Sequence, residues 1–433
     1  MKIKSLLLGS VAAAGLSTSA FAADLSVLTS LDVCDALGIS GLTISSDTNC
    51  LQITGEVSYE FNWGDYAGSA TGWPVGTFAI DTSNYDVDAN DDGVAAGTDD
   101  NQDWSSRVKS WLKFVATADS DFGPAKAVIK LKSDDEHTWT NEVDVTPADA
   151  SGTNVFIDEA YVSVGDSTVL MAGDKGSIGN TGDDEPYNFL GLYNSEVVDA
   201  GVGWQVTVAD GGHVIQVVSD LGNGVSVGLG LEDLQNDGTL VGVMSYAGDT
   251  VAAHATFYAT DVLLGAVNNW AIHAGATVSV DMMNFRVAVA ADDTGWWNGL
   301  ASAEATFDMF TLAASVEGTS ADEIGFGASA SADVTDGVTI NAGFRWFDYD
   351  TTTVETESWQ AALQLVADVT ETITLTGELG IHGENFGATD STVTYGAAQL
   401  AWAPGGGFTS SVKGQANSAG AYKVTFKAAK SFE

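Results

Sequence analysis

The sequence predicts an all-β protein, a transmembrane antiparallel β-barrel, from three observations. Polar and apolar residues alternate with period two, which is the pattern of strands that bury one face. The composition has 49 Gly and only 5 Pro in 433 residues, which is typical of many strands and turns. Long polar stretches alternate with short turns along the first half, an asymmetry that outer-membrane barrels show. We expect 16 strands, with 18 as the alternative.

Residues 1–22 are predicted to be a secretory signal peptide. Lys2 and Lys4 precede an apolar run, and Ala20-Phe21-Ala22 is a small-x-small cleavage site. No later segment approaches ~18 uninterrupted apolar residues, which a transmembrane helix needs. Export without an anchor helix leaves the periplasm, the medium and the outer membrane. The strand pattern favours the outer membrane of a Gram-negative bacterium, with its lipid and lipopolysaccharide as partners.

Residues 23–50 form an N-terminal segment that contains both cysteines, Cys34 and Cys50. An exported cysteine pair this close is most simply a disulfide. A metal site is a weaker alternative, because no His lies nearby, and a catalytic free thiol is weaker still.

Residues 51–433 are predicted to form the barrel as one domain, and the hairpin at 105–133 gives the clearest strands. Arg107, Lys109 and Lys113 share one parity, whereas Val108 and Leu112 take the other. A short turn follows, and A-K-A-V-I-K-L-K repeats the pattern from position 125. Strands are also predicted at 156–165, 338–347, 372–379 and 422–428. Between 225 and 330, Ala and Gly obscure the alternation.

Basic residues take the polar parity of several predicted strands. A charge that faces lipid at the bilayer midplane costs ~2–4 kcal/mol, so we expect these residues to face a water-filled lumen. The alternative is that some lie at strand ends and snorkel to the interface. In a closed barrel the last strand pairs with the first, so the N- and C-terminal clusters would form one basic wall. Its predicted members are Arg107, Lys109, Lys113, Lys126, Lys130, Lys132, Arg345, Lys413, Lys423 and Lys427.

Two motifs resemble a known family. Val33-Cys34-Asp35-Ala36 followed by D-T-N-C-L-Q-I-T-G (47–55) resembles the start of the general porins of alphaproteobacteria. F-I-D-E-A-Y-V-S-V-G (156–165) resembles the strand that precedes the constriction loop in Gram-negative porins. The resemblance covers residues 1–62 and 105–200. It implies a 16-stranded barrel, a homotrimer, and passive diffusion of small hydrophilic solutes. One departure is Glu433, because such barrels usually end on an aromatic residue.

The long segment 175–200 would be the third loop, which in this family folds into the lumen. Asp183, Asp184 and Glu185 are the candidates for an acidic side of the constriction, facing the basic wall. An irregular loop of this length is usually functional or disordered. The alternative is a solvated loop that points outward.

A second acidic loop, 64–106, contains a candidate calcium site. Asp88, Asn90 and Asp92 match the D-x-N-x-D-G start of a calcium loop, and Asp99 takes its twelfth position. A chance match in an Asp-rich loop is the alternative, since Glu is usual at the last position. No cofactor is otherwise required.

The formal net charge of −44 argues against nucleic acid, because phosphate contact requires basic surface. The acidity is either a solvated surface of the kind found in salty habitats or a vestibule that attracts cations. The five His residues show no ligand pair and no nucleophile motif, so the sequence gives no support for an enzyme. We therefore expect a mildly cation-selective porin that passes small hydrophilic solutes and ions. The alternative is a secreted, acidic, calcium-binding β-rich protein of a surface layer or an adhesive module.

Overall fold

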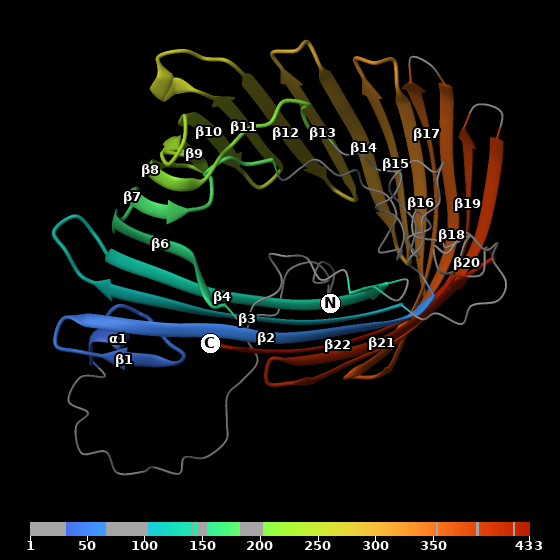
Figure 1. The fold of residues 1–433 in the computed structure, drawn as a ribbon, viewed down its shortest axis with the longest axis horizontal. Helices are drawn as coiled ribbons and strands as arrows, with labels where there is room; N and C mark the ends of the chain where they lie inside the picture. Colours follow the sequence, from blue (N-terminus) through green and yellow to red (C-terminus); the bar gives the residue numbers. More distant parts are fainter. Residues whose placement is uncertain are drawn as a thin grey trace.

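The computed structural model describes residues 32–65, 103–140, 143–144, 154–181, 202–351, 354–386, 389–418 and 421–433. These residues form one antiparallel sheet that closes on itself into a barrel (Figure 1). The described residues contain 22 strands, of which β1 (Thr43–Ser45) and β5 (Val143–Asp144) stand outside the ring, so 22 − 2 = 20 strands make the ring. The predicted barrel is confirmed, whereas the predicted number of 16 or 18 strands is wrong.

The ring strands follow each other in chain order. They are β2 (Asn49–Asp65), β3 (Asp103–Ala118), β4 (Ala125–Thr140), β6 (Phe156–Gly165), β7 (Thr168–Lys175), β8 (Gly212–Gly222), β9 (Val225–Glu232), β10 (Thr239–Ala247), β11 (Val251–Ala259), β12 (Trp270–Val280), β13 (Met283–Asp292), β14 (Trp297–Phe307), β15 (Phe310–Thr319), β16 (Ile324–Thr335), β17 (Val338–Thr351), β18 (Val354–Thr370), β19 (Ile373–Phe386), β20 (Thr389–Gly405), β21 (Phe408–Asn417) and β22 (Tyr422–Phe432).

The ring closes where the last strand pairs with the first. β22 pairs with β2 from Gly55 opposite Phe432 to Asp65 opposite Tyr422, and β2 pairs with β3 on its other side. In Figure 1 the blue and teal strands β2–β4 therefore lie beside the red strands β21 and β22. A closed ring leaves no strand edge for pairing with another chain.

The two faces of the sheet differ in polarity. One parity carries exposed apolar side chains, among them Val108, Ile129, Phe326 and Leu379. The other parity carries buried polar side chains, among them Gln216 and Gln364. The apolar parity faces outward and the polar parity faces the interior, the reverse of a soluble protein.

The N-terminal segment extends the sheet beside the seam of the ring. The helix α1 (Asp32–Ala36) is joined to β2 by a disulfide between Cys34 and Cys50, and both cysteines are buried. β1 pairs with β2 at residues 50–52, immediately before Gly55, where the pairing with β22 begins. The helices in the described ranges are all too short or too polar to cross a membrane.

Candidate functional site

A charged band lies on the inward face of β21, β22, β2, β3, β4 and β6, and we call it the charged arc. Nine of the ten predicted basic residues lie on it, because β21 and β22 close the ring against β2. They are Arg107, Lys109 and Lys113 on β3, Lys126, Lys130 and Lys132 on β4, Lys413 on β21, and Lys423 and Lys427 on β22. Their strand neighbours on the other parity, such as Val108 and Leu112, are exposed and apolar.

The charged arc is not a purely basic wall, because acids on the same face pair with its cations. Arg107 donates from Nε to Asp134 Oδ1 at 2.7 Å and from Nη2 to Oδ2 at 2.6 Å. Glu136 lies 3.3 Å from the same Nε, and Lys109 Nζ lies 4.0 Å from Asp134. Asp134 and Glu136 lie in the part of β4 beyond the predicted hairpin end at 133, so they were not among the predicted site residues.

A β-bulge adds two more acids to the arc. Lys130 pairs with Glu159 and Leu131 pairs with Ile157, so Asp158 is the extra residue of β6. Such a bulge re-aims a side chain, and here both acids reach the same lysine. Lys130 Nζ lies 2.6 Å from Asp158 and 3.7 Å from Glu159. Lys113 Nζ lies 3.2 Å from Glu159, and Lys132 Nζ lies 3.8 Å from Asp158.

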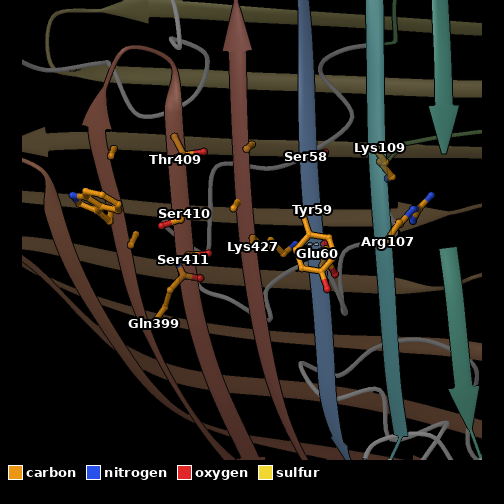
Figure 2. A pocket seen from close by; sticks show the side chains of 15 residues that line it. Ser58, Tyr59, Glu60, Arg107, Lys109, Gln399, Thr409, Ser410, Ser411 and Lys427 are labelled. Carbon is orange, nitrogen blue, oxygen red and sulfur yellow. Dashed lines mark ion pairs between the residues drawn. The ribbon is translucent and has the colours of Figure 1, made fainter. Parts of the chain in front are cut away.

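The seam of the ring carries the same arrangement in a cavity of about 420 Å³ (Figure 2). Lys427 Nζ on β22 lies 2.9 Å from Glu60 on β2, and Arg107 and Lys109 on β3 line the same cavity. Figure 2 shows these side chains on three adjacent strands. The arc therefore presents cations and acids side by side, at positions that a polar or charged solute could contact.

Arg345, the tenth predicted basic residue, lies apart from the charged arc. It is on β17, its side chain is 2 % exposed, and Nη2 lies 2.5 Å from Glu317 Oε1 on β15. The two side chains reach across β16, where Arg345 is opposite Gly327 and Glu317 is opposite Gly325. Phe347 lies against Gly325, where a Cβ would overlap its ring.

The two ends of the loop between β7 and β8 lie against the inner wall. We call residues 176–181 the outgoing stem and residues 202–211 the return limb. Val202, Trp204, Val206 and Val208 alternate along the return limb and contact inward-facing apolar residues. These are Val241, Tyr258, Ala271, Ala288, Ala290 and Leu300. This covered apolar patch explains why the alternation of the sequence is obscured between 225 and 330.

Hydrogen bonds also attach the return limb to β13 and β14. Asp292 Oδ2 accepts the backbone N–H groups of Gln205 at 2.8 Å and Val206 at 3.2 Å. Asn298 Oδ1 accepts the N–H of Gly203 at 3.2 Å. At the end of the limb, burial raises the pKa of Asp210, and the charge of a neighbouring carboxylate raises it further.

Some predicted site residues lie outside the described residues. They are the signal peptide, the loop acids Asp183, Asp184 and Glu185, and the calcium candidates Asp88, Asn90, Asp92 and Asp99. Within the described ranges, no three His, Cys, Asp or Glu side chains are grouped so that they could hold a metal ion.

The structure does bring together one histidine pair that the sequence analysis missed. His254 Nε2 lies 3.3 Å from His273 Nδ1. The two rings stack, and Trp204 of the return limb lies edge-on to His273. The contact arises from the register of the two strands, in which Thr256 is opposite His273. The spacing of the histidines in the sequence does not predict it.

Comparisons with known proteins found solved structures of low identity and low TM-score. No protein-family model and no curated protein match the chain. An anion-selective porin from Comamonas acidovorans is 12 % identical, covers 89 % of this chain and 100 % of its own, and has a TM-score of 0.36. A mutant of the Rh. blastica porin is 13 % identical, with 88 % and 100 % covered and a TM-score of 0.38. OmpT of Vibrio cholerae is 10 % identical, with 90 % and 100 % covered and a TM-score of 0.35. These scores carry no argument about function.

Proposed function

We propose that this protein is a porin of the outer membrane of a Gram-negative bacterium, a water-filled channel for small hydrophilic solutes and ions. The observation that carries the proposal is the closed ring with an apolar outer face and a charged inner face. In lipid every backbone polar group needs an internal partner, and a closed barrel meets this need. An exposed apolar outer face suits lipid, and charged residues inside suit water.

The third loop is proposed to narrow the lumen. In ring order, β13 and β14 are opposite the charged arc, and the return limb is hydrogen-bonded to these two strands. The limb therefore occupies the far wall and leaves the space beside the arc for solutes. We propose that Asp183, Asp184 and Glu185, on the part of the loop between stem and limb, face this space.

We further propose a mild preference for cations. The net charge is −44. Much of the basic charge of the arc is offset by acids on the same face, which are Glu60, Asp134, Glu136, Asp158 and Glu159. The preference should weaken with salt, because charges are screened over ~10 Å at 0.1 M ions. A zero-current potential in a KCl gradient that indicates anion preference would contradict this part of the proposal.

Conductance in planar bilayers tests the channel itself. The purified protein is expected to give stepwise ohmic currents, and cell fractionation is expected to recover it in the detergent-extracted outer membrane. Neutralising Asp183, Asp184 and Glu185 together should shift selectivity toward anions. Deleting most of residues 178–192 should widen the pore and admit larger sugars. Recovery in the soluble fraction, without channel activity, would reject the porin.

Assembly as a homotrimer within lipid and lipopolysaccharide is part of the proposal, supported only by the resemblance of the two motifs. A detergent-stable oligomer that dissociates on heating, seen as a mobility change on a gel, tests it. Calcium at Asp88, Asn90, Asp92 and Asp99 stays a prediction. The alternative of a secreted adhesive or surface-layer protein has no support, because a soluble protein rarely exposes a large apolar outer face to water.

A further inference from the structure

One carboxylate is bonded to both ends of the third loop. Glu232 is the last residue of β9, and its side chain is 0 % exposed. Its Oε1 accepts the N–H of Ile178 at 3.0 Å and Nε2–H of Gln216 at 2.8 Å. Its Oε2 accepts the N–H of Gly211 at 2.8 Å. Ile178 belongs to the outgoing stem and Gly211 to the return limb, so Glu232 joins the two.

The surrounding contacts fix the same junction. Gln216 Nε2 also donates to the carbonyl of Gly176 at 3.0 Å, and the N–H of Asp233 donates to the carbonyl of Gly211 at 2.7 Å. Gly179 lies so close to the hydroxyl of Tyr258 that a Cβ at this position would overlap it. The outgoing stem therefore follows the wall at a distance that only glycine allows.

A carboxylate suits this junction because three donors converge on it. Buried N–H groups need acceptors, and an ionised acceptor gives a stronger hydrogen bond than a neutral one. A glutamine side chain has the same shape but only one acceptor oxygen. In either orientation its NH₂ group would face one of the backbone N–H groups, from Ile178 or from Gly211.

Asp292 makes a second, separate attachment some distance along the return limb. It accepts the N–H groups of Gln205 and Val206 through one oxygen, while its other oxygen accepts from Thr294 at 2.9 Å. Asp292 is 2 % exposed, so these bonds are shielded from water. The apolar contacts of the limb are non-directional, whereas the two carboxylates specify its register on the wall.

We infer that Glu232 and Asp292 are positioning residues, which hold the third loop in register on the inner wall and so set the width of the channel. The part of the inference about channel width rests on the proposed porin function. The part about loop attachment does not, and it can be measured without conduction.

Thiol labelling of the folded protein tests the attachment. The described part of the chain has no free cysteine, so Val202→Cys reports on the return limb and Ile178→Cys on the outgoing stem. Val202 is 5 % exposed, and its thiol should react slowly with a maleimide while the limb is in place. The control variant is Glu304→Gln, which removes an inward-facing charge on β14. Glu304 accepts Asn284 Nδ2 at 3.2 Å, a bond that glutamine can keep.

Loss of a buried charge-assisted hydrogen bond should raise the population of the detached state and the labelling rate roughly tenfold. We expect Glu232→Gln to raise labelling at both reporters. We expect Asp292→Ala to raise labelling at Val202→Cys much more than at Ile178→Cys. The heat-dependent gel mobility of each variant shows whether the barrel itself is folded. Labelling rates equal to those of Glu304→Gln, in folded barrels, would overturn the inference.

Single-channel recording of the same variants separates the two proposals. Larger or fluctuating conductance in Glu232→Gln and Asp292→Ala, with steady conductance in Glu304→Gln, supports both. Faster labelling with unchanged conductance would keep the attachment and overturn the role of the loop in setting channel width. Absence of channels in the unmodified protein would reject the porin and leave the labelling result standing.

Discussion

Replacement of Glu317 by alanine should destabilise the barrel severely. Arg345 and Glu317 are both almost fully buried, and their charged atoms lie 2.5 Å apart. Removing one partner of a buried ion pair typically costs about 3–5 kcal/mol, because the remaining buried charge loses that counter-charge. Because each 1.4 kcal/mol corresponds to about a factor of ten, the folding equilibrium constant should fall at least about a hundredfold.

The double variant Arg345→Met with Glu317→Leu should lose much less folding free energy than Glu317→Ala. Replacement of a buried pair by apolar side chains of similar volume is often neutral or stabilising. The double-mutant cycle should therefore return a coupling energy of about 3 kcal/mol. The matched comparison is Lys427→Met at the seam, because its pair with Glu60 is 57 % and 36 % exposed. An exposed pair contributes about 0–1 kcal/mol.

Urea-induced unfolding of the purified barrel in detergent, followed by tryptophan fluorescence and gel mobility, gives these free energies where the transition is reversible. Equal losses in Glu317→Ala and Lys427→Met would refute the reasoning, since burial would then make no difference. Additive effects of the two single changes at Arg345 and Glu317 would refute it as well, because partners in one ion pair must couple.

Three further outcomes are expected. Asp158→Asn with Glu159→Gln removes the two acids that pair with Lys113, Lys130 and Lys132, and should shift the zero-current potential in a KCl gradient toward anions. An unchanged potential would show that this part of the arc does not meet the ion path. Serine at Cys34 and Cys50 should destabilise the N-terminal segment by about 3 kcal/mol, as expected for a loop of this length, and raise hydrogen exchange in α1 while the barrel stays folded. Burial raises the pKa of Asp210 above its ordinary 3.8. The uncharged carboxyl group therefore stabilises the attached return limb at low pH. This stabilisation is lost as pH rises through the raised pKa. Asp210→Asn should therefore slow thiol labelling of the limb at neutral pH and flatten its pH dependence, measured against an unfolded reference at each pH.

The fold class could be predicted because strand alternation is a local property. At 105–133 the charged and apolar residues separate cleanly by parity, and the structure forms β3 and β4 there. The union of the N- and C-terminal basic clusters was also predictable, because closure of a ring makes its first and last strands neighbours. Both inferences needed no knowledge of packing.

The strand number could not be predicted, for a physical reason. The return limb covers a set of apolar side chains that face inward, which include Val241, Ala271, Ala288 and Ala290. Their strands lose the polar and apolar contrast on which period-two analysis depends. The alternation V-G-W-Q-V-T-V (202–208) is present in the sequence, but it belongs to a segment outside the ring of paired strands.

Four acids of the charged arc, on β4 and β6, were missed for two local reasons. A bulge at Asp158 breaks strict period two, so both Asp158 and Glu159 reach Lys130. β4 continues to Thr140, past a run of polar residues in which a loop was the natural expectation. Bulges and strand extensions depend on the neighbouring strand, which a single-strand pattern does not contain.

The seam between β2 and β22 has a consequence for how the chain folds. Gly55 and Phe432 are partners across the seam although almost the whole chain separates them. Pairing at such sequence distance is slow, since loop-closure entropy opposes it until the other strands are in place. Until then the edges of β2 and β22 are open to pairing with other chains. β1 pairs with residues 50–52 of β2. The disulfide-linked N-terminal segment therefore shortens the edge of β2 that is exposed before β22 pairs with it.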